Sequence, residues 1–512
     1  MKKYGKDKNL LVNINNKLAK LWFGFRRLSF AKHIIFFYFF ITLIGSLILL
    51  LPISRKVDVT YINSLFTSAS AFSDTGLVTI TTSETWTYFG QAVIAVLILI
   101  GGMGWFALKV YLFSIIFKRP ISFKTREVLS AERGSTKIGS TTQLIKISIT
   151  VMFIVIIVAS IVLTCYFYFV PVVGSNNPIA KQDTNKMLHQ VTQSGFTNGS
   201  SPYGNLENAI RFGIFHSISA INNAGFDIMG RNSISPYYHH YGMQIIFIVL
   251  FILGGMGYPV IYDFYLYITK KIKGERHLFS LFSKISSATY LIIALLSIII
   301  TFSIEVNAKD AFWHNDYYGS TGDKTMALIF NTLSTRNAGF STIDIHSLSS
   351  STLIVFSILM FIGSAPSSTA GGIRTTTIAI IFMSIWARIR GKDNVIAFNK
   401  RISSKIVSKA FIVFVTAFFL IVLASIITAS SYHELDGRQH TFTDIVFEVT
   451  SAFGTTGLST GITPNLSVGA KITLIIVMFI GQLGVSSSLL VWGGIKNKGK
   501  RYSHIKEDIT IG

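Results

Sequence analysis

Eight apolar stretches, each long enough to cross a lipid bilayer, constrain this chain more than any other feature of its sequence. A transmembrane helix needs about 20 mainly apolar residues, and 50% of the 512 residues are hydrophobic while only 13% are charged. Soluble globular proteins carry about 25% charged residues, and disordered chains are far less apolar. The stretches are His33–Pro52, Phe89–Phe117, Leu144–Pro171, Met243–Thr269, Ala288–Glu305, Leu353–Trp386, Val407–Ser430 and Lys471–Gly494. We therefore expect an all-α membrane protein with eight transmembrane helices and both chain ends on one side.

The basic residues indicate which side the ends occupy. The chain has 46 Lys and Arg residues against 23 Asp and Glu, a net charge of +23, which in a soluble protein would suggest nucleic-acid binding. If the spans alternate, 33 of the 46 lie on one face of the membrane, and Lys and Arg mark the cytoplasmic face. They occupy the arm before the first span, Lys118–Lys146, Lys270–Lys284, Arg388–Lys409 and the tail from Lys496. We expect a multi-pass protein of the cell membrane with both termini cytoplasmic, in contact with anionic lipid and without a nucleic-acid partner.

One motif recurs four times, always between an odd-numbered and an even-numbered span. Each copy is a Ser/Thr-rich segment too short to cross the membrane, followed by a turn with Gly at its third position. The turns, here named the four glycine loops, are Asp74-Thr75-Gly76-Leu77, Asn223-Ala224-Gly225-Phe226, Asn337-Ala338-Gly339-Phe340 and Thr455-Thr456-Gly457-Leu458. One copy could be an ordinary extracellular turn. Four copies at equivalent places predict a repeated unit of span, short re-entrant helix, glycine loop and span.

These units predict four pore repeats around one central pore, a pseudo-fourfold arrangement. Repeats 1 to 4 cover residues 33–118, 144–273, 285–391 and 405–495, between a basic cytoplasmic arm (1–32) and a cytoplasmic tail (496–512). Non-helical backbone survives at membrane depth only when it is buried in protein or lines water. Short helices that point inward would direct their partially negative C-terminal ends at a cation, and glycine lets carbonyl oxygens replace the water around K⁺. The candidate ion-selectivity filter, with K⁺ as its metal ion, is Thr75, Gly76, Ala224, Gly225, Ala338, Gly339, Thr456 and Gly457.

The sixth apolar stretch is interrupted in its middle. Residues 351–390 would form a helix of about 60 Å, twice the thickness of the hydrocarbon core. Gly, Pro and hydroxyl residues favour a loop here. The interruption consists of Gly363, Ser364, Ala365, Pro366, Ser367, Ser368, Thr369, Ala370, Gly371 and Gly372, with Arg374 just after it. We interpret this segment as an intramembrane gate below the glycine loops; the alternatives are a plain kink or two half-spans joined at the cytoplasmic surface.

The even-numbered spans of the other repeats contain shorter glycine clusters. They are Gly101-Gly102-Met103-Gly104, Gly254-Gly255-Met256-Gly257 and Gly481-Gln482-Leu483-Gly484. Such clusters are compatible with kinks beside the pore and, more commonly, with close packing between helices. Among the polar residues, Glu448 and Arg336 are expected to brace the loops through hydrogen bonds, and His216 to be structural. Asp74 could either concentrate cations at the pore mouth or bond to neighbouring hydroxyl groups.

The loops and the interrupted span resemble those of the Trk/Ktr/HKT superfamily of potassium transporters, and most closely its bacterial KtrB type of membrane subunit. NNAGFD, STRNAGFST and SAFGTTGLST are similar to the loops of that family, SAFSDTGL less so, and GSAPSSTAGGIRTTT is similar to its gating loop. The resemblance covers roughly residues 33–495. It implies one filter glycine per loop, and a preference for K⁺ because Gly76 stands where some Na⁺-favouring members have Ser.

The resemblance also implies partners and one departure. Family members of this type form homodimers with a pore in each protomer and sit on a cytosolic nucleotide-binding ring of the KtrA kind, which Lys118–Lys146 and Arg388–Lys409 could dock. An Arg is usual in the family where Gln482 stands, and it would place a positive charge below the filter. Arg374 could take over this role, or gating could be looser. We therefore regard Gln482 and Asp74 as pore-lining candidates.

No motif in the sequence points to catalysis. A nucleotide-binding loop, a nucleophile elbow, a zinc-protease motif and paired intramembrane carboxylates are all absent from the sequence. We therefore expect no enzyme and no cofactor bound by this chain, but a channel-like subunit for potassium uptake, with Na⁺ dependence or Na⁺ permeation left open. The alternative is a secondary transporter of another small solute that uses broken helices. Such transporters usually have inverted repeats, which four repeats of the same sense fit poorly.

Overall fold

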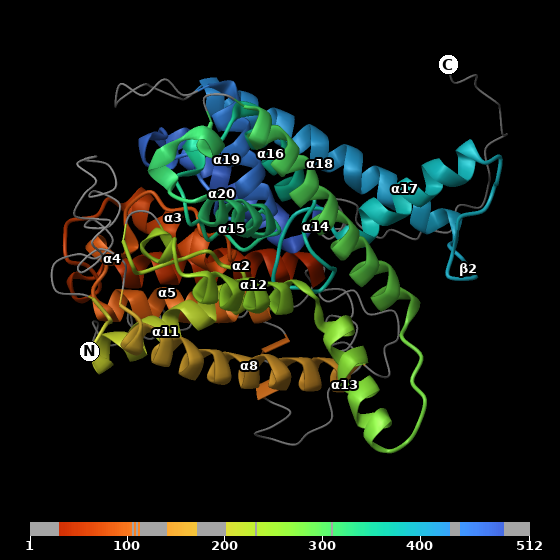
Figure 1. Ribbon diagram of the computed structural model, residues 1–512, viewed down its shortest axis with the longest axis horizontal. Helices are drawn as coiled ribbons and strands as arrows, with labels where there is room; N and C mark the ends of the chain where they lie inside the picture. Colours follow the sequence, from red (N-terminus) through yellow and green to blue (C-terminus); the bar gives the residue numbers. More distant parts are fainter. Residues whose placement is uncertain are drawn as a thin grey trace, which may run out of the picture. The chain divides into compact units, whose positions relative to one another are not determined.

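The described part of the chain is predominantly helical, as predicted for the fold class. The computed structural model describes residues 30–104, 107–108, 111–112, 141–171, 201–230, 233–308, 311–430 and 441–485. Within these ranges the strands β1 (Ile396–Ala397) and β2 (Lys400–Arg401) form one short antiparallel hairpin (Figure 1). The tail 496–512, nearly all of the arm 1–32 and most of Lys118–Lys146 lie outside the described residues.

Three single helices among the described residues are long and apolar enough to cross a membrane. They are α8 (Thr141–Phe169), α14 (Leu281–Asn307) and α18 (Ser404–Ser430). The pair α12 (Tyr241–Gly255) and α13 (Tyr258–Ile272) meets the same criteria together but is bent by 101°. The fourth apolar stretch is therefore not one straight span, because the chain changes direction at Met256 and Gly257.

Shorter apolar helices lie in the other predicted stretches. They are α2 (Phe30–Leu50), α5 (Tyr88–Met103), α16 (Ser350–Phe361), α17 (Thr375–Ile389) and α20 (Val468–Leu483), and the one-turn helix α4 (Thr82–Thr85) precedes α5. The sixth stretch is divided between α16 and α17, as its Gly and Pro residues predicted. The arrangement in eight spans stays a prediction.

A short helix precedes each glycine loop. The four are α3 (Tyr61–Phe72), α11 (Leu206–Ile221), α15 (Thr321–Ser334) and α19 (Phe442–Gly454). Ser320 and Asp323 form a capping box at the start of α15, and Thr441 and Asp444 form another at the start of α19. Asn205 caps α11 by accepting a hydrogen bond from the N–H of the third helical residue. These side chains supply acceptors that the first turn of a helix otherwise lacks, which explains where these helices begin.

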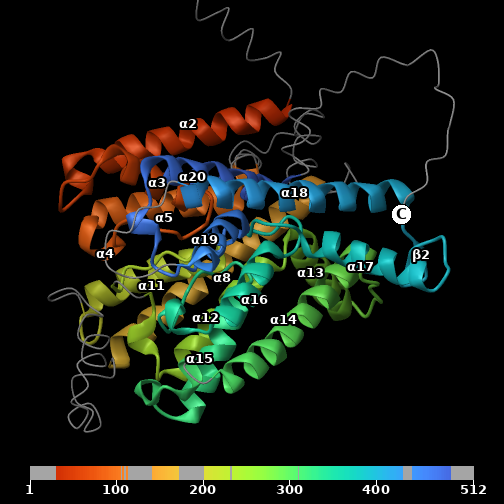
Figure 2. The same ribbon diagram turned by 90° about the horizontal axis from the view of Figure 1, so that it is seen from above.

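Each short helix packs against the apolar helix that follows the previous short helix in the chain, and the first short helix packs against the last apolar helix. The contacts are α11 with α5, α15 with α12, α19 with α16, and α3 with α20. The last of these joins the fourth repeat to the first, so the four repeats form a closed circle of packing contacts. Figure 2 shows α3 beside α20 and, in the neighbouring repeats, α19 close to α16.

The glycine clusters of the even-numbered spans serve close packing, the more common of the two interpretations made from the sequence. A Cβ atom on the first glycine of each cluster would overlap a carbonyl oxygen at the end of the short helix of the same repeat. The pairs are Gly101 with Phe72, Gly254 with Ile221, and Gly481 with Phe453. The clusters also end helices, because their last glycines have φ angles of 78°, 80° and 81°, which side chains other than glycine rarely adopt.

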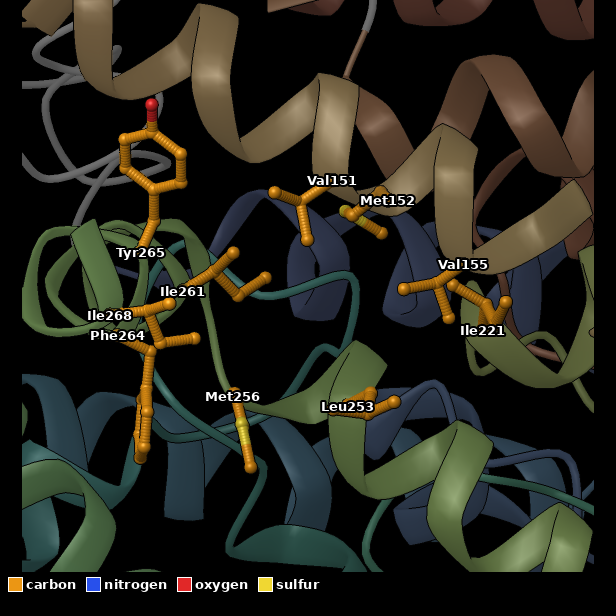
Figure 3. A pocket seen from close by; sticks show the side chains of 10 residues that line it. All are labelled: Val151, Met152, Val155, Ile221, Leu253, Met256, Ile261, Phe264, Tyr265 and Ile268. Carbon is orange, nitrogen blue, oxygen red and sulfur yellow. The ribbon is translucent and has the colours of Figure 1, made fainter. Parts of the chain in front are cut away.

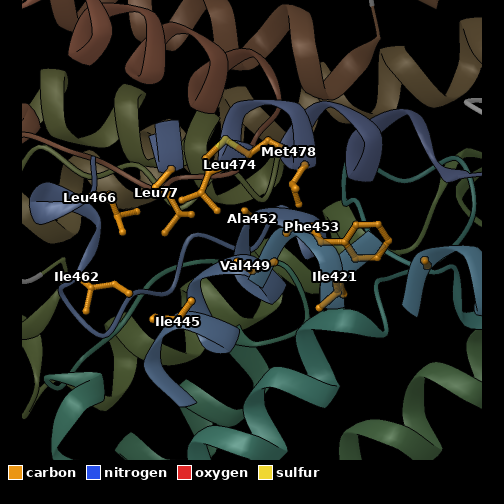
Figure 4. Close-up of a cluster of buried hydrophobic side chains, with 14 of the residues drawn as sticks. Leu77, Ile421, Ile445, Val449, Ala452, Phe453, Ile462, Leu466, Leu474 and Met478 are labelled. Atoms are coloured by element: carbon orange, nitrogen blue, oxygen red, sulfur yellow. The ribbon is translucent and has the colours of Figure 1, made fainter. Parts of the chain in front are cut away.

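A cluster of buried apolar side chains holds α19 between α18 and α20 (Figure 4). Val449, Ala452 and Phe453 of α19 contribute to it, and so does Leu77, which directly follows the first filter glycine. The ring of Phe453 is fully buried, with its centroid 5.7 Å from that of Phe361 in α16. Apolar burial in this cluster therefore stabilises the junction between the fourth repeat and the first.

Replacing Phe453 with Ala should destabilise the protein, because a buried ring is removed and a cavity remains. We expect Phe453→Ala to lower the free energy of unfolding by about 3–5 kcal/mol, measured by unfolding of the purified protein in detergent. Phe419→Ala is the matched control, since Phe419 of α18 is 65% exposed. Equal destabilisation by the two substitutions would contradict the assignment of this core.

Candidate functional site

The four glycine loops begin where the short helices end, and they share one backbone conformation. In every loop the residue two positions before the glycine and the glycine itself have positive φ. The values are 51° and 83° for Asp74 and Gly76, 55° and 66° for Asn223 and Gly225, 74° and 77° for Asn337 and Gly339, and 50° and 93° for Thr455 and Gly457. Asn and Asp adopt this conformation more readily than other side chains, whereas the β-branched Thr455 requires support from its surroundings.

One type of hydrogen bond attaches every loop to its short helix. The N–H of the residue before the glycine donates to the carbonyl oxygen of a serine near the end of the helix. The bonds run from Thr75 to Ser70 (2.9 Å), Ala224 to Ser219 (2.8 Å), Ala338 to Ser334 (2.9 Å) and Thr456 to Ser451 (2.9 Å). Each loop is therefore fixed at a helix C-terminus, the end that carries partial negative charge.

The glycines of the four loops, Gly76, Gly225, Gly339 and Gly457, lie against one another in a closed ring. A Cβ atom on any of them would collide with the backbone of the next loop, and the last collision returns to the first loop. A Cβ on Gly76 would overlap the carbonyl oxygen of Ala224, and a Cβ on Gly225 would lie 2.9 Å from the Cα of Gly339. A Cβ on Gly339 would overlap the carbonyl oxygen of Thr456, and a Cβ on Gly457 would overlap that of Thr75, which closes the ring. The structure thus brings together all eight residues that the sequence analysis placed in the filter.

Polar side chains of two short helices hold the chain beyond the loops. Glu448 of α19 accepts hydrogen bonds from the hydroxyl of Ser459 and from the N–H of Thr460 (3.2 Å). Asn331 of α15 occupies the equivalent place, donating to the Thr342 hydroxyl (2.9 Å) and accepting from the Thr342 N–H (3.4 Å). The predicted bracing role of Glu448 is confirmed, and Asn331 has the same role in the third repeat.

His216 of α11 is a structural residue, as predicted. It is fully buried, and its Nδ1 lies 2.8 Å from the carbonyl oxygen of Phe212 one turn earlier in the same helix. Its ring packs against that of Phe167 in α8, with 5.6 Å between the centroids. These contacts fix α11 against α8.

Residues 362–374, here named the gate loop, connect α16 to α17 and are largely buried. The N–H of Ala365 donates to the carbonyl oxygen of Gly255 (3.2 Å) at the end of α12. The N–H of Gly371 donates to the hydroxyl of Thr455 (2.7 Å). The gate loop therefore contacts the second repeat and the fourth glycine loop, and it supplies the support that the strained Thr455 requires.

Arg336 joins the start of the gate loop to the third glycine loop. Its buried guanidinium donates to the carbonyl oxygens of Ile362 (2.7 Å) and Gly363 (3.0 Å) and lies 5.1 Å from the centroid of the Tyr290 ring. A buried charge requires such partners because desolvation is costly. The expected bracing by Arg336 is confirmed.

Arg374 joins the other end of the gate loop to the first glycine loop through α20. Its guanidinium donates to the carbonyl oxygen of Ala370 and to that of Gln482 (3.3 Å). The side-chain amide of Gln482 in turn donates to Oδ2 of Asp74 (3.2 Å). Asp74 is fully buried, and its role at the pore mouth stays a prediction.

Three residues that shape the loops were not predicted from the sequence as site residues. Asn223, Asn337 and Thr455 have positive φ and stand two positions before the glycine of their loops. Of the four residues at this position, only Asp74, in the first loop, was predicted to be a site residue. The signal was present in part, because Asn and Asp at this spacing are typical of left-handed turns. The role of Thr455 depends on the gate loop and has no local signal.

Comparison with known proteins agrees with this architecture. The TrkH family, described as cation transport protein, matches residues 22–498. The uncharacterized cation transporter MG322 of Mycoplasma genitalium is 33% identical, with 98% of this chain and 100% of that protein aligned. The Ktr system potassium uptake protein D of Bacillus subtilis is 32% identical, with 96% of this chain and 100% of that protein aligned.

A solved structure shows the same fold. The potassium transporter TrkH from Vibrio parahaemolyticus superposes with a TM-score of 0.64 at 16% sequence identity, covering 91% of this chain and 85% of that one. The sequence relatives that align over nearly the whole chain and the solved structure with the same fold are all named as cation or potassium transporters. The chain belongs to the TrkH family of cation transport proteins, within the Trk/Ktr superfamily of potassium transporters.

Proposed function

We propose that this protein takes up K⁺ across the cell membrane through a pore on the axis of its four repeats. The observation that carries the proposal is the closed ring of glycine loops, in which every filter glycine meets the backbone of the next loop. Such a ring presents backbone rather than side chains to its axis. Carbonyl oxygens can then replace the hydration shell of a K⁺ ion, as in other potassium pores.

In this proposal the eight loop residues from Thr75 to Gly457 named above form the selectivity filter. The C-terminal ends of α3, α11, α15 and α19 lead into the loops, and their partial negative charge favours a cation. Each loop supplies one glycine, so the filter is short, and we expect weaker discrimination against Na⁺ than in pores with longer filters. K⁺ is the substrate, and Na⁺ could also pass or be required.

The gate loop closes the pore in this proposal. Two arginines support this role, since Arg336, next to the third glycine loop, holds one end of the gate loop and Arg374 holds the other end beside Gln482. The guanidinium of Arg374 lies where the family usually has an Arg in place of Gln482, so it can supply a positive charge below the filter. Opening then requires the Arg374 contacts to break.

The topology follows from the charge pattern and the repeats. We propose eight spans in four pore repeats (33–118, 144–273, 285–391 and 405–495), with both termini and the basic connectors in the cytoplasm. The membrane potential supplies the driving force, because an inward-moving K⁺ gains about 2.3 kcal/mol per 100 mV. The relative from Bacillus subtilis is named as part of a Ktr system, which supports work with further subunits; we propose a homodimer on a cytosolic nucleotide-binding ring, as the family resemblance implies.

The hairpin β1–β2 is a candidate surface for that ring. Lys400 and Arg401 are exposed on it, and an acidic face of a partner would complement them. The alternative of a solute transporter with broken helices is less well supported, because breaks occur at equivalent glycines in repeats 1, 2 and 4 as well as in repeat 3.

Expression of the protein should restore growth of a K⁺-uptake-deficient bacterium at low external K⁺. The physical reason is that a selective K⁺ path suffices for uptake when the membrane potential is negative inside. Growth at high K⁺ controls for toxicity. Failure to restore growth, with a cognate regulatory subunit also expressed, would overturn the proposed function.

The filter predicts a sharp difference between two glycines with the same backbone angle. Gly457 and Gly461 both have φ of +93°, but a Cβ on Gly457 would overlap the carbonyl oxygen of Thr75 while a Cβ on Gly461 meets nothing within 4 Å. Both substitutions with Ala carry about 1–2 kcal/mol of left-handed strain. We expect Gly457→Ala to reduce K⁺ flux into vesicles at least about tenfold and Gly461→Ala to retain most of it. Similar flux in the two variants would contradict the ring as the filter.

The gate predicts that Arg374→Gln raises basal K⁺ flux. The substitution removes a charged hydrogen bond worth about 1.5–3 kcal/mol, which shifts the balance towards the open state about tenfold or more. Arg388→Gln is the matched control, because Arg388 forms an exposed ion pair with Asp393. Unchanged flux in Arg374→Gln, or in a variant lacking residues 363–372, would show that the gate lies elsewhere.

A further inference from the structure

An apolar cavity of about 310 Å³ lies between α8, the end of α11 and the bent pair α12–α13 (Figure 3). Val151 and Val155 of α8 form one wall, and Ile261 and Tyr265 of α13 form the opposite one. Ten side chains line it, and the Tyr265 hydroxyl is the sole polar side-chain group among them. The lining suits a hydrocarbon chain and offers almost nothing to water or to a polar solute.

The cavity opens where the helices display apolar side chains outwards. On α8 the neighbouring Ile154 and Val158 are each 54% exposed, and on α13 Phe264 and Ile268 are 44% and 55% exposed. Helix faces of this kind contact lipid in a membrane protein. An acyl chain can therefore enter the cavity from the bilayer without crossing a polar surface.

One basic side chain lies just beyond the cavity on its own face of α13. Lys271 comes three residues after the cavity residue Ile268 and, at about 100° per residue, projects within about 70° of the lining face, whereas Lys270 projects from the opposite face. The acidic residue nearest in sequence on α13, Asp263, is buried and accepts hydrogen bonds from Ser280 and Ser283. The net charge offered to a headgroup here is therefore positive.

We propose that this cavity binds one acyl chain of an anionic phospholipid of the cytoplasmic leaflet, with the headgroup at Lys271. The assignment of the leaflet rests on the proposed function, because the topology given there places this lysine on the cytoplasmic side. Attraction between such a lysine and anionic lipid is worth about 1 kcal/mol. The apolar chain contributes burial of its methylene groups, at about 0.8 kcal/mol each.

The bound chain would act on the gate loop through the bend between α12 and α13. The hydroxyl of Ser148 in α8 donates to the carbonyl oxygen of Tyr258 (3.0 Å), and the N–H of Tyr258 donates to the carbonyl oxygen of Ser367 in the gate loop (3.2 Å). The cavity residue Met256 lies at the same bend. A lipid between α8 and α13 therefore stabilises the segment to which the gate loop is bonded, and K⁺ flux should depend on the fraction of anionic lipid.

Lipid binding can be tested by native mass spectrometry of the purified full chain, given equal amounts of phosphatidylglycerol and phosphatidylcholine. We expect the wild-type chain to retain phosphatidylglycerol in preference. Val155→Trp fills the cavity and should retain one phosphatidylglycerol fewer per chain. Val158→Trp is the matched control, because Val158 lies one turn away on the same helix and outside the cavity. The variant Lys271→Gln should keep a lipid but lose the preference.

Two results would overturn the inference: equal retention of both lipids by the wild-type chain, or equal retention of phosphatidylglycerol by Val155→Trp and Val158→Trp. A change of oligomeric state in Val155→Trp alone would show that a second copy of the chain covers the cavity, and it would also overturn the inference. Should Val155→Trp fail to fold, Val155→Phe and the lipid preference of the wild-type chain serve in its place.

K⁺ flux into vesicles with and without phosphatidylglycerol separates this inference from the proposed function. Wild-type flux that changes with the fraction of phosphatidylglycerol, and does not change in Val155→Trp, supports both. Flux that is independent of phosphatidylglycerol overturns the link to the gate. Absence of wild-type K⁺ flux in every lipid contradicts the proposed function and leaves the binding result to stand by itself.

Discussion

The contact of four glycine loops, backbone against backbone, is the constraint on which the rest of the structure depends. No side chain fits where the loops meet, since a Cβ on Gly76, Gly339 or Gly457 would overlap a carbonyl oxygen of the next loop. Loops without side chains at their contacts cannot hold themselves in place by apolar packing. The short helices, the serine carbonyl oxygens at their ends and the bracing side chains of Glu448 and Asn331 supply the support instead.

The gate loop is attached to the glycine loops at both of its ends, so the two cannot move independently. Arg336 bonds the first end beside the third loop, and Arg374 reaches the first loop through Gln482 and Asp74. Between these ends, Gly371 bonds to the strained Thr455 of the fourth loop. Movement of the gate loop therefore alters the support of three of the four glycine loops.

Much of the fold and of the candidate site was predictable because it rests on local patterns. Apolar runs marked the helices, and the repeated Gly turn marked all eight loop residues that the structure brings together. The bend of 101° between α12 and α13 was not predictable, since Gly254-Gly255-Met256-Gly257 is equally compatible with a straight, closely packed helix. The match between Glu448 and Asn331 was also hidden, because the two side chains differ and Asn331 stands eight residues before Gly339 whereas Glu448 stands nine residues before Gly457.

The sequence by itself determined that the chain is helical and apolar, that it contains four copies of one unit, and that a glycine stands at each loop. These properties follow from hydrophobicity and repetition, which act over a few residues. Only the tertiary structure decided which backbone each glycine meets, that Arg374 lies beside Gln482, and that α8 and α13 enclose a cavity. The partners in these contacts are about 100 residues or more apart in the chain, and their meeting depends on how the four repeats close into a circle, for which no local pattern of residues carries the information.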